Sequence, residues 1–162
     1  MITTQNLVEG FRGNLEIIKL QAEGLSQQDS LIQLPFRGNC FNWVIGHILV
    51  NRCNMLIVLG AEDSLAGVNL DRYQRESDPI LGPGEGVLVL TELLTHLETT
   101  QAQLEKTLKN ETEESLQRLA SVSARPEWTM AYWLFFYYFH DCYHTGQTEI
   151  LRQAAGVDDK II

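Results

Sequence analysis

Two histidines near the end of the chain have the spacing of a pair of metal ligands. His140 and His144 are four residues apart, so in a helix their imidazole rings lie one above the other on the same face. Gln147 falls close to the same direction. Two buried imidazoles without partners would have unmet hydrogen-bonding groups, and a metal ion shared with a third ligand would satisfy them. The spacing predicts part of a metal site whose third ligand comes from elsewhere in the chain.

His47 is the candidate for that third ligand. It lies in segment 43–58, which is apolar on nearly all sides when drawn as a helix and is therefore expected to be enclosed by neighbouring helices. Asn51 and Asn54 follow on the same helix face. A single histidine on an apolar helix is usually a core residue satisfied by its neighbours. Combined with the later pair, however, His47 completes a set of three imidazoles.

Three neutral imidazoles hold a divalent cation and leave a coordination position open for water or substrate, which is typical of catalytic sites. Zinc, nickel, copper and iron all suit such ligands, and the sequence does not rank them. The ion lowers the pKa of a coordinated thiol or water and so supplies a nucleophile at neutral pH. Asn51, Asn54 and Gln147 are candidate substrate-binding residues; alternatively, they hydrogen-bond only to one another or to the ligands.

Four long helices are expected to position these residues. Apolar spacing and end signals predict helices over residues 4–24, from Asn39 or Asn42 to residue 59, over 86–108, and over 126–155. Residues 61–86 are rich in glycine and proline, which predicts a long loop that either covers one end of the bundle or is a solvated surface loop. His96 is expected to be exposed and not a ligand. The predicted fold is all-α, a four-helix bundle forming one domain over residues 1–162.

Composition and charge narrow the class of ligand. Lysine and arginine total 12 against 21 acidic residues, a net charge of −9 that repels phosphate backbones and anionic lipids. The start of the chain has no signal-peptide pattern, and the apolar segment 44–59 is interrupted by polar residues. Three cysteines without paired spacing fit a reducing compartment. We therefore expect a cytoplasmic protein that binds a small molecule and neither nucleic acid nor a membrane.

The second and fourth helices carry more apolar surface than a slender bundle can bury. The first half of the fourth helix, residues 128–139, is dense in aromatic side chains. Such a stripe is more often core or dimer interface than a cofactor site. The sequence therefore predicts a homodimer packed through one or both of these helices.

Taken together, two motifs resemble those of the DinB/YfiT-like superfamily. They are Trp43-Val44-Ile45-Gly46-His47, opening a long helix, and His140-xxx-His144-x-Gly146-Gln147, followed by Leu151-Arg152. The resemblance covers essentially the whole chain. It implies a four-helix bundle with an unusual helix linkage, often dimeric, and a metal held by three histidines at one end. Those roles would fall on His47, His140 and His144.

The resemblance also implies an activity. Characterised members are bacillithiol, mycothiol or glutathione S-transferases and a thiol-dependent isomerase, and others are described as metal-dependent hydrolases. This sequence departs from some members by having Asn51 and Asn54 where they carry acidic residues or histidine, which leaves the substrate class open. We expect a metal-dependent S-transferase that activates a low-molecular-weight thiol. The alternatives are a hydrolase that uses metal-bound hydroxide and a noncatalytic, stress-related ligand-binding bundle.

Overall fold

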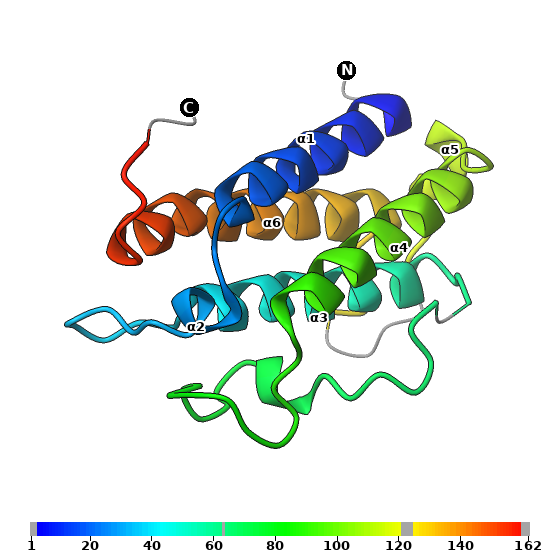
Figure 1. The fold of residues 1–162 in the computed structure, drawn as a ribbon. Helices are drawn as coiled ribbons and strands as arrows, with labels where there is room; N and C mark the ends of the chain where they lie inside the picture. Colours follow the sequence, from blue (N-terminus) through cyan, green and yellow to red (C-terminus); the bar gives the residue numbers. More distant parts are fainter. Residues whose placement is uncertain (1–2, 63, 121–124, 160–162) are drawn as a thin grey trace.

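Four long helices form the body of the computed structural model, which describes residues 3–62, 64–120 and 125–159 (Figure 1). They are α1 (Thr4–Ala22), α3 (Phe41–Val58), α4 (Leu90–Leu108) and α6 (Met130–Ala154). Three single turns accompany them: α2 (Gln27–Ser30), η1 (Asp71–Tyr73) and α5 (Glu113–Leu116). Within the described residues, the β pairing is limited to an isolated bridge between Leu119 and Thr129. The predicted all-α bundle is confirmed.

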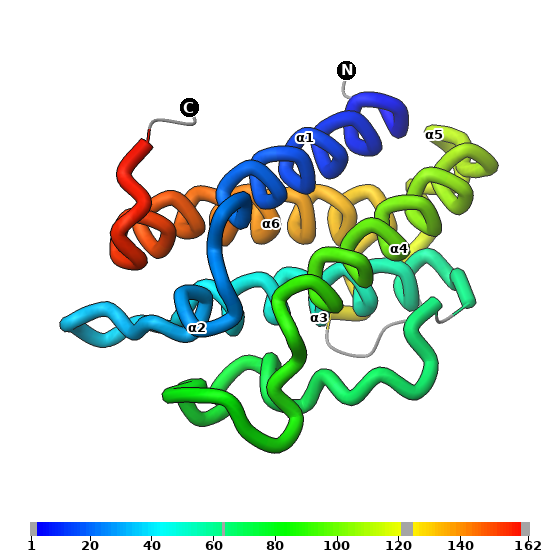
Figure 2. Tube along the Cα trace, in the orientation of Figure 1, coloured from blue at the N-terminus to red at the C-terminus, as the bar shows by residue number. Residues whose placement is uncertain are grey.

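The helices lie at the corners of a square in an order that differs from their order in the sequence. α3 packs against α4 and α6, and α1 packs against the same two helices. The consecutive long helices α1 and α3 therefore occupy diagonal corners, as do α4 and α6. Figure 2 shows that α3 and α4 run in the same direction, so residues 59–89 must return along the length of the bundle before α4 can begin. This return explains the long loop that the sequence predicts.

α3 is enclosed by its neighbours, as its composition predicts. Fourteen of its 18 residues are buried, including His47 and Arg52. Gly60, with a φ of 72°, lies just past its end and allows the chain to turn into the loop. None of the helices in the described ranges combines the length and the apolar character that crossing a membrane requires.

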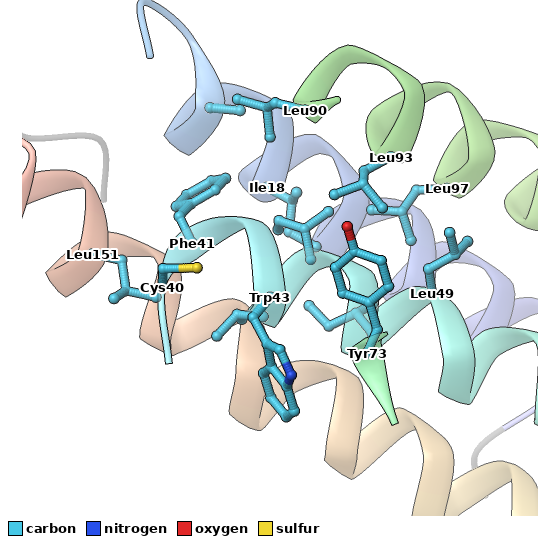
Figure 3. Packing of buried hydrophobic residues seen from close by; sticks show 14 of the residues in the cluster. Ile18, Cys40, Phe41, Trp43, Leu49, Tyr73, Leu90, Leu93, Leu97 and Leu151 are labelled. Atoms are coloured by element: carbon cyan, nitrogen blue, oxygen red, sulfur yellow. The ribbon is translucent and has the colours of Figure 1, made fainter. Parts of the chain in front are cut away.

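The loop contributes a residue to the core. Tyr73, from η1, is completely buried and lies beside Leu49, Leu93 and Leu97 (Figure 3). Its hydroxyl accepts a hydrogen bond from the Leu88 amide at 2.7 Å and donates one to Asn42 Oδ1 at 3.0 Å. Because of these contacts, the part of the loop that contains η1 is attached firmly to α3.

Two helix starts differ from the predicted ones. Neither Asn39 nor Asn42 caps α3: Cys40 is the N-cap residue, and Asn42 is completely buried, where its amide donates to the Leu88 carbonyl at 3.0 Å. α4 begins at Leu90 and not near residue 86. The bonds from Asn42 and Tyr73 to the Leu88 backbone hold this residue outside the helix, which no local pattern reveals.

α6 also begins later than predicted, at Met130 and not near Pro126. Thr129 caps the helix by accepting a hydrogen bond from the Tyr132 amide, and the Met130 amide donates to the carbonyl of Arg118. The chain before α6 is therefore fixed by the segment that follows α5. α6 still has 25 residues, about 37 Å at the rise of an α-helix. Its middle section carries His140 and His144 and lies beside the first half of α3, which carries His47.

Candidate metal centre

The structure brings together the three histidines that the sequence analysis singled out. His47 comes from the first half of α3, and His140 and His144 come from successive turns of α6. One ring nitrogen from each lies within 4.8 Å of the others. The ring centroids are 5.1 Å apart for His47 and His140, 5.0 Å for His47 and His144, and 4.4 Å for His140 and His144. Helical periodicity thus predicted correctly that the rings face one another.

Hydrogen bonds orient two of the three rings. His47 Nδ1 lies 2.8 Å from the carbonyl oxygen of Tyr73, and His144 Nδ1 lies 2.7 Å from Gln147 Oε1. Because these oxygens only accept, both Nδ1 atoms carry the proton and both Nε2 atoms carry the lone pair. Asn51 donates to the His47 carbonyl at 2.8 Å and approaches His47 Nε2 at 3.4 Å. This is the arrangement by which proteins present Nε2 to a metal.

His140 differs from the other two histidines because one of its ring nitrogens, Nδ1, is buried and has no hydrogen-bond partner. Its Nε2 lies 3.2 Å from His144 Nε2, close to the roughly 3.3 Å that separates two nitrogen ligands of a tetrahedral zinc ion with bonds of 2.0–2.1 Å. A divalent cation would fit this donor set, held by one ring nitrogen each from His47, His140 and His144.

The imidazoles are held in the neutral form that binds metals. Burial lowers the pKa of His140 to about 3, and the charges that His144 and His47 would carry act in the same direction. Burial also lowers the pKa of His47 and of His144. All three rings are therefore neutral at pH 7, so protons do not compete with a metal ion for their nitrogen lone pairs.

The histidines lie in the wall of an open cavity of about 550 Å³. Its lining is mostly apolar and aromatic and includes Phe36, Trp43 and Tyr143. The Trp43 ring stacks on His47, with the centroids 4.6 Å apart. The cavity has room for a small organic molecule next to the ligand nitrogens, and its apolar lining strengthens electrostatic interactions there.

The other predicted site residues differ in whether they contact the histidines and line the cavity. Gln147 lines the cavity and binds His144. Asn51 is half-buried and binds His47. Asn54 is exposed and is not among the cavity residues, since seven residues along α3 move it about 10 Å down the helix axis although it keeps the direction of His47. His96 on α4 is half-buried, where we expected it exposed, and lies outside the cluster of ligand nitrogens.

Sequence reasoning missed a buried ion pair directly behind the histidines. Arg52 donates to both carboxylate oxygens of Asp141, at 2.8 and 3.2 Å, and both side chains are at most 3% exposed. Asn14 also donates to Asp141, while Arg52 reaches Gln101 and the Phe11 carbonyl. The group connects all four long helices. A lone arginine in an apolar helix signals such a partner, because a buried charge must be paired.

Comparison with known proteins agrees with this architecture. A crystal structure described as the conserved protein of a locus from Enterococcus faecalis superposes with a TM-score of 0.74; 96% of this chain and 98% of that one are covered, at 14% identity. Similarity at that identity shows the fold. No curated protein matches the chain significantly. A family model described as the DinB superfamily matches residues 19–148, which include all three histidines. The chain therefore belongs to the DinB superfamily.

Proposed function

We propose that this protein is a metal-dependent enzyme that activates a low-molecular-weight thiol for transfer to an electrophile. The observation that carries the proposal is the set of three neutral imidazoles opening into the 550 Å³ cavity. Among the residues lining this cavity in the described part of the chain, none is acidic. A divalent charge at the histidines would therefore remain uncompensated until an anion such as a thiolate binds.

The chain's own residues have separate tasks in this proposal. His47, His140 and His144 hold the cation, which when bound lowers the pKa of a thiol or water that shares it. The Tyr73 carbonyl and Gln147 fix two of the rings through their Nδ1 protons. Trp43 and Tyr143 line the cavity next to the histidines and offer aromatic surface to the carbon chain of a substrate. Gln147 also lines the cavity, so its amide nitrogen can donate to a bound substrate.

Metal analysis of purified variants tests the site. His47→Ala and His144→Ala each remove one of three ligands, so both should lose most of the metal that the wild-type protein holds. His96→Ala is the matched control, because it removes a histidine outside the cluster and should keep full metal content. Equal metal content in all four proteins would remove the basis of the proposal.

Two other functions follow from the same site. One is a hydrolase in which water takes the place of the thiol; it would turn over ester or amide substrates without added thiol. The other is a noncatalytic ligand-binding bundle. Thiol-dependent conjugation of an aryl halide such as chlorodinitrobenzene, lost in His144→Ala and kept in His96→Ala, favours the transferase. Inactivity with every thiol and every ester would favour the binding module.

We also propose that the protein is a homodimer that packs through α6. Five large side chains, at spacings of three, four and seven residues, form a continuous exposed stripe on this helix: Tyr132, Phe135, Phe139, Tyr143 and Ile150. Each is between 53% and 61% exposed. An exposed apolar stripe of this kind favours contact with another apolar surface, and a second copy of the chain supplies one. Tyr143 belongs to both the stripe and the cavity lining, so the partner would border the site.

A further inference from the structure

The cavity beside the histidines carries positive charge in a protein that is strongly acidic overall. The chain has a net charge of −9, yet the charged side chains among the described residues lining this cavity are two arginines, Arg37 and Arg75. A ligand that enters therefore meets two guanidinium groups and the imidazole cluster. The charge around this cavity is therefore opposite in sign to the net charge of the protein.

The two arginines reach the cavity from separate segments of the chain. Arg37 lies in the connector between α2 and α3, and Arg75 lies two residues after η1. Both also line a second, adjoining cavity, which again includes Trp43. The Trp43 indole donates to Ser77 Oγ at 2.9 Å and so ties the loop to α3 beside Arg75. The two arginines therefore line the same pair of adjoining cavities, and the loop that carries Arg75 is tied to α3.

Both guanidinium groups are available to a ligand. Arg75 pairs with its neighbour Glu76 at 3.8 Å, and these side chains are 88% and 84% exposed, so the pair contributes little. Arg37 is exposed and makes no hydrogen bond or ion pair within the described residues. Arg75 also lines the same cavity as the three histidines, so its charge faces the space into which they open.

We infer that Arg37 and Arg75 form an anion-binding subsite at the mouth of the cavity, which selects small molecules that carry a carboxylate or phosphate group. The inference rests on the proposed function, because the other end of such a molecule would reach the metal through its thiol. Guanidinium groups match both kinds of anion through paired N–H donors. The carbon chain that connects the thiol to the anionic group would lie against neutral residues of the cavity, which include Trp43 and Tyr143.

Thiol binding to the cobalt-loaded protein tests this subsite, since a thiolate that binds cobalt changes its absorption spectrum. The probes are ω-mercaptocarboxylates from mercaptopropionate to mercaptooctanoate, the matching mercaptoalcohols, and the matching mercaptophosphonates. The proteins are the wild type, the double variant Arg37→Gln/Arg75→Gln, and the control Arg125→Gln, which removes an exposed arginine that does not line the cavity. Glutarate binding, measured by calorimetry, supplies a probe without a thiol.

We expect the wild type to bind the best carboxylate or phosphonate about tenfold more tightly than its alcohol, because each of the two exposed guanidinium–anion contacts contributes at most about fivefold and the two contributions multiply. The double variant should lose this preference and keep its affinity for the alcohol, while Arg125→Gln should resemble the wild type. The tighter of the two anions identifies the head group. An equal preference in wild type and double variant would overturn the inference while leaving thiol binding intact. If no thiol changes the cobalt spectrum, the proposed function fails. In that case, glutarate binding that is lost in the double variant would support the subsite, and glutarate binding that is unchanged in the double variant would overturn it.

Discussion

Gly46→Ala tests how firmly the loop holds His47, a histidine of the proposed metal site. A Cβ atom at position 46 would lie 2.0 Å from Cδ1 of Tyr73 and 2.4 Å from Cε1 and Cγ, where ordinary contacts are 3.4–4 Å. The ring would have to move by roughly 1.5 Å to restore such contacts. Tyr73 is completely buried, and its carbonyl accepts the proton of His47 Nδ1. The substitution should therefore disturb the bundle and the site together.

The size of the effect follows from three contributions. Overpacking a well-packed core costs about 1–3 kcal/mol. Displacing the ring also weakens the two hydrogen bonds of the Tyr73 hydroxyl, at about 1 kcal/mol each. Alanine recovers about 1 kcal/mol through its higher helix propensity. We expect a net loss of about 2–4 kcal/mol in the free energy of unfolding. Because the oxygen that orients His47 moves as well, metal affinity should fall about 10- to 100-fold.

Urea unfolding of the metal-free protein measures the first effect, and competition with a coloured chelator measures the second. Gly13→Ala is the matched control: Gly13 is also inside a long helix, but a Cβ atom added there would have no neighbouring atom within 4 Å. This control should gain up to about 1 kcal/mol and leave metal affinity unchanged. If Gly46→Ala unfolds at the wild-type urea concentration and binds metal as tightly, the close packing of Tyr73 on α3 and its role at His47 are both refuted.

Three further predictions concern other parts of the molecule. Asp141→Asn leaves Arg52 buried without its counter-charge and should cost about 3–5 kcal/mol in urea unfolding, whereas Glu105→Gln, which breaks the surface pair with Arg12, should cost less than about 1 kcal/mol; equal losses would contradict the assignment. The metal-free protein should lose stability as the pH falls from 7 to 5, because the unfolded chain protonates His140 near its ordinary pKa of 6.5 while the folded chain does so only near 3. His140→Gln should reduce the change in the free energy of unfolding between pH 7 and pH 5 by about 1 kcal/mol after allowance for solvent screening. An unchanged pH dependence would contradict a lowered pKa of His140. Phe135→Glu combined with Phe139→Glu should convert a dimer into a monomer that still binds metal, as measured by sedimentation; a wild-type protein that is already monomeric would refute the dimer.

Features that depend on helical period could be predicted from the sequence. His140 and His144 converge because four residues make about one turn, and His47 meets them because α3 is apolar enough to be enclosed. The same reasoning failed for Asn54, since direction around a helix says nothing of distance along it. Periodicity therefore identified the face of each helix that contributes to the site and did not define how far the site extends.

Features that depend on contacts between distant segments could not be predicted. The start of α4 is set by bonds from Asn42 and Tyr73 to Leu88, which are 46 and 15 residues away in sequence. The ion pair between Arg52 and Asp141 spans 89 residues. The arginine alone indicated that a partner exists, but nothing in one sequence says which of 21 acidic residues it is.

The atom that fixes the proton on His47 is a main-chain oxygen, that of Tyr73. Every amino acid supplies such an oxygen, so this control over the imidazole depends on the path of the loop and on few of its side chains. Positions 74 and 75, which are exposed and include Arg75 at the cavity, can thus be redesigned for a different substrate while the carbonyl oxygen that faces His47 stays in place. In this bundle, recognition and reactivity are separable targets for protein engineering.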